Sequence, residues 1–243
     1  MAREERTVAG YLWVDHAAPE HERAAEVGGR VRLPELRPPW LVVYETPGRV
    51  LVNRWPGRLL HVETVPAASE AERSALAEVT ARIVPGAGYT NAVCVDVVAE
   101  LSPALPFGTY GEAVVRVVEA ALALDEPTAH RLAEARHRDA EDACRAAWRR
   151  WSEQPKTWGV GSPVGSGFGL LHRLVRDSAR ERGGQDAWVV DGDGDEEAAE
   201  PWRSAYGALR EAAMAHGAPD LCDSAARTAM STAWNAVYGP MPG

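Results

Sequence analysis

Cysteine pairs and long apolar segments, which often reveal a protein's class, are missing from this chain of 243 residues. Its three cysteines, Cys94, Cys144 and Cys222, lie far apart and form no C-x-x-C pair, so we expect neither a disulfide framework nor a zinc site. No stretch approaches the roughly 18 apolar residues of a membrane-spanning helix, and the sequence "MAREERTVAG" lacks the apolar core of a signal peptide. We therefore expect a soluble protein in a reducing cytoplasm, with no membrane contact.

Lysine is almost absent, because Lys156 is the only lysine among 26 basic residues, and the net charge is −9. Non-specific nucleic-acid binding depends on basic side chains that neutralise phosphates, so no nucleic-acid partner is expected. Much of the negative charge is local, since residues 186–200 hold seven acids and no base. Apolar residues make up 46% of the chain and charged residues 25%, which indicates a folded globular protein rather than a disordered one.

The acidic run "VVDGDGDEEAAEPW" matches a calcium-binding loop only in part. An EF-hand loop places carboxylates at its first, third and fifth positions, as Asp191, Asp193 and Asp195 do. It also requires Gly at the sixth position and Glu at the twelfth, where this chain has Glu196 and Trp202. We therefore interpret the run as a solvated connection and expect no metal there.

A small antiparallel sheet is predicted in the first half of the chain. Within residues 40–65, two Pro-Gly pairs separate three runs rich in Val, Leu and Tyr, and such pairs can reverse the chain, which predicts a three-stranded meander. Further strands are expected at 7–14, 30–33 and 90–101. Two S/T-x-x-E capping boxes predict helices in the same half, and they are formed by Ser69 with Glu72 and by Thr109 with Glu112.

The second half has the pattern of helices rich in alanine and tryptophan, with a short strand at 187–190. The helices are expected at 125–151, at 168–182, from Pro201 to Gly217, and after Asp220. The predicted fold class is therefore α+β, with an N-terminal antiparallel β-meander and packed helices followed by an Ala/Trp-rich helical half. We predict an α+β sheet domain at 1–124 and a mainly helical region at 125–243. The helical region contains an acidic, Gly-rich connection at 152–200. The two parts either pack separately or form one unit.

The predicted meander brings together a histidine and two carboxylates. If each Pro-Gly pair forms a loop, Glu45, Val50 and Glu63 line up across three strands, and His61 shares their face because side chains alternate along a strand. A histidine between carboxylates is suited to acid–base chemistry or ligand binding. The simpler interpretation is that these residues lie on the solvent-exposed face of a sheet. A register shift by one residue would move all of them to the other face.

Two further groups of side chains are candidate sites. Arg54 and Arg58 flank "WPG" and could hold a carboxylate or phosphate, although arginines at strand ends are common. His130, Glu134, His137 and Glu141 would share one face of a continuous 125–151 helix, where Glu-x-x-His is a metal-binding unit of di-metal bundles. No second such unit exists in the chain, so the stripe equally fits a solvated helix edge.

The absence of a complete triad, metal set or nucleotide loop favours a non-catalytic cytoplasmic binding or regulatory module that recognises a protein partner or a small ligand. The alternative is a hydrolase or transferase that acts on a small molecule, with Glu45, His61 and Glu63 in its cleft and the loop at 159–169 as a lid. A homo-oligomer formed through the C-terminal helices is a third option. An enzyme predicts a concave pocket over the sheet face, whereas a binding module predicts an exposed apolar patch centred on tryptophan.

Overall fold

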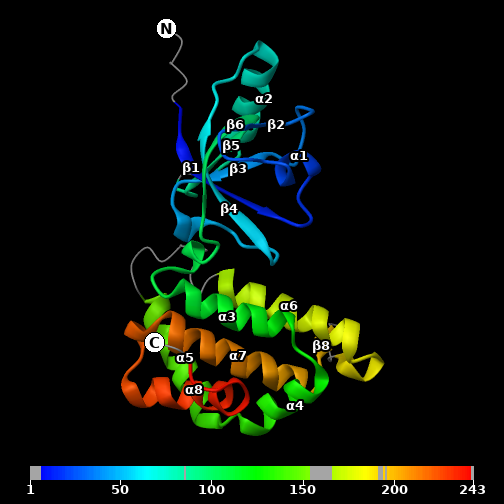
Figure 1. Cartoon of the computed structure of the whole chain (residues 1–243), viewed down its shortest axis with the longest axis vertical. Coiled ribbons are helices and arrows are strands. Elements are labelled where there is room, and N and C mark those ends of the chain that lie inside the picture. The colour runs from blue at the N-terminus through cyan, green and yellow to red at the C-terminus, as the bar shows by residue number, and fades with distance from the viewer. Residues whose placement is uncertain (1–6, 85, 154–165, 191–193, 195, 242–243) are drawn as a thin grey trace. The chain divides into compact units, whose positions relative to one another are not determined.

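The chain folds into two compact units, a sheet unit of residues 1–106 and a helical unit of residues 107–243. The computed structural model describes residues 7–84, 86–153, 166–190, 194 and 196–241. The fold class is α+β as predicted, with an antiparallel sheet in the first half and helices in the second (Figure 1). Within the described residues, no helix combines the length and the apolarity required to cross a bilayer.

The sheet unit contains six antiparallel strands in the order β2-β6-β4-β1-β3-β5. The strands are β1 (Ala9–Asp15), β2 (Arg30–Arg32), β3 (Leu41–Tyr44), β4 (Gly57–Thr64), β5 (Tyr89–Ala92) and β6 (Cys94–Leu101). A short helix, α1 (Glu20–Arg23), lies between β1 and β2, and α2 (Glu70–Thr80) follows β4. The strands expected at 7–14 and 30–33 are confirmed, and the stretch at 90–101 forms two strands instead of one.

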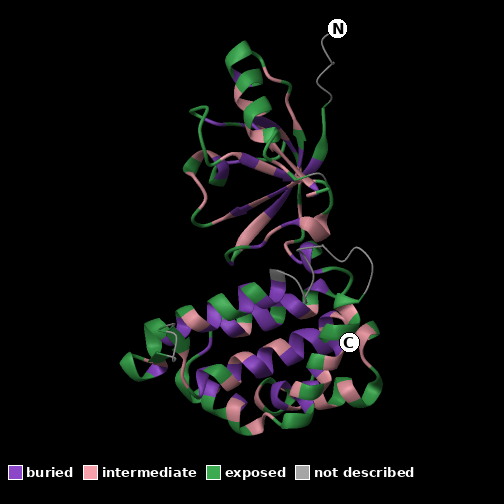
Figure 2. Ribbon diagram, turned by 180° about the vertical axis from the view of Figure 1, so that it is seen from behind, coloured by how far each residue is buried: buried purple, intermediate pink, exposed green. Residues whose placement is uncertain are grey.

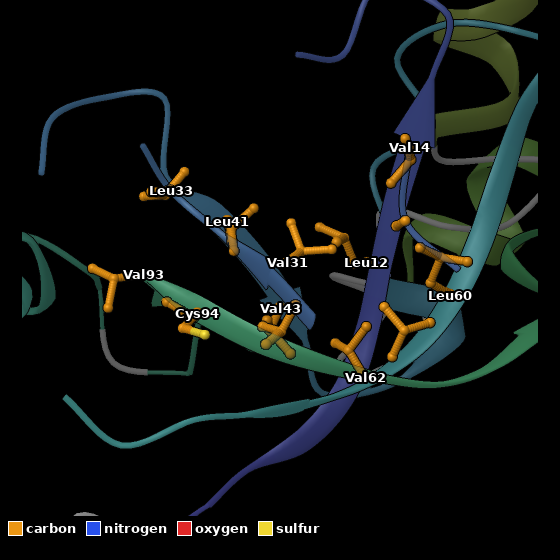
Figure 3. Close-up of a cluster of buried hydrophobic side chains, with 14 residues drawn as sticks. Leu12, Val14, Val31, Leu33, Leu41, Val43, Leu60, Val62, Val93 and Cys94 are labelled. Carbon is orange, nitrogen blue, oxygen red and sulfur yellow. The ribbon is translucent and has the colours of Figure 1, made fainter. Parts of the chain in front are cut away.

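One face of the sheet carries an aliphatic core. Leu12 and Val14 of β1 alternate with Trp13, and they pack with Leu60 and Val62 of β4 among the buried side chains of Figure 3. Leu12 lies directly opposite Leu60 in the ladder, and both side chains are almost completely buried. The alternation of apolar side chains along each strand therefore fixes which face is covered.

The predicted meander is wrong in its connections. Strand β1 lies between β3 and β4, and the expected middle strand does not form, because Pro47–Arg49 makes a 3-10 turn. The following segment instead buries Val50, Val52 and Trp55. Trp55 stacks on Trp13 with ring centroids 5.9 Å apart, so the segment covers the sheet face opposite the aliphatic core.

Helix α2 begins as its capping box predicts. Ser69 is the N-cap residue, and its Oγ accepts a hydrogen bond of 3.2 Å from the backbone N–H of Glu72. The carboxylate of Glu72 accepts a hydrogen bond from the backbone N–H of Ala68 and pairs with Arg32 of β2. The cap therefore also ties the helix to the edge of the sheet.

The helical unit is built around one central helix. Its helices are α3 (Gly111–Leu122), α4 (Glu126–Ala135), α5 (Arg138–Ser152), α6 (Ser166–Arg182), α7 (Trp202–Gly217) and α8 (Ser224–Tyr238). Helix α7 contacts the other five, and most of its residues are buried (Figure 2). A two-stranded hairpin of β7 (Trp188–Val190) and β8 (Glu196–Ala198) precedes α7, which confirms the strand expected at 187–190.

Two helix predictions in this unit are wrong in detail. The expected helix at 125–151 is interrupted, because Arg136 and His137 have extended backbone conformations between α4 and α5. The capping box of Thr109 and Glu112 does not form, since α3 has Tyr110 as its N-cap residue and no side-chain cap. Helix α3 packs on α6 and α7, so it belongs to the helical unit; the predicted division of the chain into 1–124 and 125–243 stays a prediction.

Candidate ligand-binding cavities

The histidine of the predicted sheet site lies in a row of aromatic side chains. His61 of β4 is opposite Tyr11 of β1, which is opposite Tyr44 of β3, which in turn is opposite Tyr89 of β5. The rings of Tyr11 and His61 are 5.6 Å apart, and those of Tyr44 and Tyr89 are 6.1 Å apart. All four side chains are half-buried, so they stabilise the sheet through cross-strand contacts.

The two carboxylates predicted beside His61 occupy separate places. Glu63 is exposed and lies opposite Asp96 of β6, whereas Glu45 is exposed just past the end of β3. Because β1 separates β3 from β4, the cross-strand alignment on which the site was predicted does not exist. The acid–base role of these residues stays a prediction.

The two arginines around "WPG" differ in their surroundings. Arg58 pairs with Glu100, with 2.7 Å between Nη2 and Oε2, and it donates a hydrogen bond of 3.0 Å to the carbonyl oxygen of Ala25. Its guanidinium is therefore largely occupied by the fold. Arg54 is exposed. Arg58 also borders a small cavity of about 280 Å³ next to Asp15.

The histidine and glutamate stripe is divided by the break between α4 and α5. His130 and Glu134 are exposed on α4, while Glu141 of α5 pairs with Arg136 and Arg145. No group of three or more His, Cys, Asp or Glu side chains capable of holding a metal ion occurs among the residues that the structure describes. The three aspartates of the acidic run and most of the loop at 159–169 lie outside those residues.

The helical unit contains a cavity of about 580 Å³ with aromatic walls, which we call the aromatic cavity. Its main lining residues are Cys144, Trp148, Phe168, His172, Tyr206 and Arg210. Trp148 and Phe168 stack with ring centroids 5.5 Å apart, and His172 meets Tyr206 edge-on at 5.2 Å. Aromatic walls with a few polar groups are the usual composition of small-molecule sites.

Arg210 supplies the main unpaired charge of the aromatic cavity. Its guanidinium lies 5.9 Å from the ring centroid of Phe168 and 5.8 Å from that of Tyr206. Its buried Nε has no hydrogen-bond partner, and it forms no ion pair within the described part of the chain. Glu141, which also lines the cavity, is already shared by two other arginines. The cavity therefore has a net positive character.

Burial shifts the pKa of two titratable groups of the aromatic cavity. Burial raises the pKa of the Cys144 thiol to about 11, although the nearby Arg210 acts in the opposite direction. Burial and then the charges of Arg176 and Arg173 lower the pKa of His172. At neutral pH the thiol is thus protonated and the imidazole uncharged, so the cavity offers no thiolate nucleophile.

A second cavity, of about 380 Å³, adjoins the aromatic cavity at His172 and Tyr206, which line both. This hairpin cavity lies between α6 and the β7–β8 hairpin, whose Trp188 is covered by Arg176 and Arg180 at 5.4 and 5.0 Å from its ring centroid. The buried Nε of Arg176 has no hydrogen-bond partner. Both cavities therefore place an unused guanidinium N–H beside an aromatic ring.

A further cavity, of about 750 Å³, lies between the first part of α3, the end of α7 and α8. We call it the hydroxyl cavity, and Arg116, His216, Arg227, Thr228, Ser231 and Asn235 are among its lining residues. Ser231 Oγ is 3.1 Å from His216 Nε2 and donates a hydrogen bond of 2.8 Å to the carbonyl oxygen of Arg227. With the hydroxyl proton of Ser231 given to the carbonyl of Arg227, Nε2 of His216 donates to Ser231 in the matching tautomer of the imidazole.

The three cavities of the helical unit were not predicted, because their residues come from separate helices and, for the hairpin cavity, also from β7 and β8. One signal was available: the aromatic cavity is lined by pairs four residues apart on three helices, Cys144 with Trp148, Phe168 with His172, and Tyr206 with Arg210. Residues at this spacing share a helix face. The spacing alone does not reveal that the three faces meet.

Comparison with known proteins found no matching family model, no similar curated protein and no similar solved structure.

Proposed function

We propose that this protein is a non-catalytic cytoplasmic binding protein that holds a planar, negatively charged small molecule in the aromatic cavity. The observation that carries the proposal is Arg210, a cation without an ion-pair partner in the described residues whose buried Nε lacks an acceptor beside two aromatic rings. An anionic ligand would supply that acceptor, and its flat surface would pack on Trp148 and Phe168.

The chemistry of the lining residues supports binding rather than turnover. The pKa of Cys144 is raised by burial, the pKa of His172 is lowered by burial, and Glu141 is held by Arg136 and Arg145. The Cys144 thiol is therefore held in its protonated, weakly nucleophilic form, which favours binding over a thiol-based hydrolase mechanism. The alternative of a hydrolase or transferase on the sheet face receives no support from the placement of His61 on β4 and Glu45 just past the end of β3, because β3 and β4 are not neighbours.

Calorimetric titration with 2-naphthoate tests the proposal, with 2-naphthalenemethanol as a neutral probe of similar shape. We expect 2-naphthoate to bind more tightly than the alcohol. Arg210→Gln should weaken 2-naphthoate binding by about ten- to a hundredfold, because a hydrogen bond to a charged group contributes roughly 1.5–3 kcal/mol. The same change should affect the alcohol little.

Two further variants make this titration decisive. Trp148→Leu removes a stacking surface from a residue that is 40% exposed, so the fold should survive while both probes bind several-fold more weakly. Arg138→Gln, at an exposed position at the start of α5 and outside the lining of both the aromatic cavity and the hydroxyl cavity, is a matched control that should leave 2-naphthoate binding unchanged. Equal affinity of the two probes, or no loss on Arg210→Gln in a protein with unchanged circular dichroism, would contradict the proposal.

A further inference from the structure

The hydroxyl cavity is separate from the aromatic cavity and shares none of its lining residues. One wall is helix α8, where Ser224, Thr228, Ser231 and Asn235 recur at intervals of four, three and four residues. This spacing places the four side chains on one face of the helix. The cavity therefore has a polar wall about three turns long.

Two hydroxyl groups of this wall, those of Thr228 and Ser231, present acceptors to the cavity. Thr228 Oγ1 donates to the carbonyl oxygen of Ser224 at 2.9 Å, and Ser231 Oγ donates to that of Arg227 at 2.8 Å. Because each hydroxyl has given its single proton to the backbone, its oxygen offers lone pairs to the cavity. A ligand that hydrogen-bonds to these two oxygens must bring donors of its own.

Two arginines border the same space from different helices. Arg116 comes from α3 and Arg227 from α8, and both are exposed. Neither forms an ion pair within the described residues. Guanidinium groups bind carboxylate and phosphate oxygens through paired N–H donors. Glu112 also lines the cavity, so one carboxylate and two cations that form no ion pair in the described residues lie around the acceptors of the α8 wall.

We propose that the hydroxyl cavity is a second ligand site, which binds an anionic polyol such as a phosphorylated sugar. The anionic group is held by Arg116 and Arg227, and the ligand hydroxyls donate to the oxygens of Thr228 and Ser231. The buried hydrogen bond between His216 and Ser231 fixes the floor of the site by orienting the serine oxygen. This inference does not depend on the function proposed for the aromatic cavity.

Calorimetric titration of the full chain with D-glucose 6-phosphate tests the site, with D-glucose and inorganic phosphate as the two half-ligands. We expect the sugar phosphate to bind at least tenfold more tightly than either half. Arg116→Gln and Arg227→Gln should each weaken its binding by about tenfold, a loss typical of a charge-assisted hydrogen bond. Both residues are exposed, so neither change should disturb folding.

Thr228→Val separates the hydroxyl wall from the arginines, because it keeps the shape of the side chain and removes the oxygen. It should weaken sugar phosphate binding several-fold and leave inorganic phosphate unaffected. Arg210→Gln, in the aromatic cavity, should leave both unchanged, so the two proposals can fail separately. The site would be overturned if the sugar phosphate did not bind, or if neither Arg116→Gln nor Arg227→Gln weakened its binding. The polyol assignment would be overturned if inorganic phosphate bound as tightly as the sugar phosphate.

Discussion

The two units differ in the side chains from which they build their cores. The sheet unit buries Val and Leu side chains on one face, whereas α7 of the helical unit buries mainly alanine together with Trp202, Leu209 and Met214. Small residues allow helices to approach closely, but they do not fill the space where helices diverge. The cavity beside Arg58 in the sheet unit measures about 280 Å³, while the aromatic and hydroxyl cavities of the helical unit measure about 580 and 750 Å³. This difference is the reason that both proposed ligand sites lie in the helical unit.

Two buried glutamates, Glu211 of the helical unit and Glu22 of the sheet unit, have different surroundings, whereas Glu72 of the sheet unit is paired with an arginine of β2. Glu211 of α7 is completely buried and accepts hydrogen bonds of 2.9 and 2.6 Å from Nε and Nη2 of Arg136. Glu22 of α1 is almost as buried, but no arginine of the described residues pairs with it, and Nε2 of His21 lies 3.8 Å from its Oε1. Burial raises the pKa of both carboxyls, and only for Glu211 do arginines act in the opposite direction. The two sites therefore predict different responses to mutation and pH.

Breaking the ion pair of the helical unit should have the largest effect. Arg136→Met leaves Glu211 buried without its hydrogen-bond donor, which should lower the free energy of unfolding by about 3–5 kcal/mol. Native-state hydrogen exchange in α4 and α7 would measure the loss. Arg145→Met is the control, because Arg145 is 60% exposed in its surface pair with Glu141 and should contribute less than about 1 kcal/mol. An equal loss in both variants would show that the buried pair has no special role.

The break before α5 explains why this ion pair was not foreseen. The stretch at 125–151 contains helix-forming residues throughout and no Gly or internal Pro near Arg136, so its local pattern predicts one helix. Arg136 pairs with Glu211, which is 75 residues away. Gly207 of α7 leaves space for this guanidinium, since a Cβ at that position would collide with Arg136. A partner so distant in sequence leaves no local signal.

In the sheet unit, patterns that depend on neighbouring residues were predicted well, and patterns that depend on distant ones were not. The Ser69 cap and strand β1 could be predicted because both depend on residues close together in the sequence. The cap is a hydrogen bond between residues three positions apart, and the burial of β1 alternates from one residue to the next. The apolar residues Val50 and Val52 are typical of a strand. Here they are buried in a segment without strand pairing, which covers the sheet face opposite the aliphatic core. Alternating apolar residues indicate burial, and burial alone does not establish strand pairing.

Removing aliphatic volume should test the sheet core. Leu60→Ala deletes a fully buried side chain opposite Leu12, so we expect a loss of about 3 kcal/mol in the free energy of unfolding, measured by hydrogen exchange in β1 and β4. Val98→Ala in β6 is the matched control, because Val98 is 44% exposed beside the irregularity of the β4–β6 ladder. It should cost less than about 0.5 kcal/mol. Similar losses in the two variants would contradict the assignment of the core to the face of Leu60.

The unpaired glutamate of the sheet unit should make its stability depend on pH. Burial, and then the charge of Asp15, raises the pKa of Glu22 from 4.5 to about 7. The folded state therefore holds a proton that the unfolded state releases above pH 4.5, so this contribution is complete below pH 4.5 and is lost as the pH rises through 7. Glu22→Gln imitates the protonated carboxyl, and its stability relative to the original protein should increase by roughly 2 kcal/mol between pH 4.5 and 8. Urea unfolding at a series of pH values measures the difference; a difference independent of pH would show that Glu22 is ionised at no cost in the folded sheet unit.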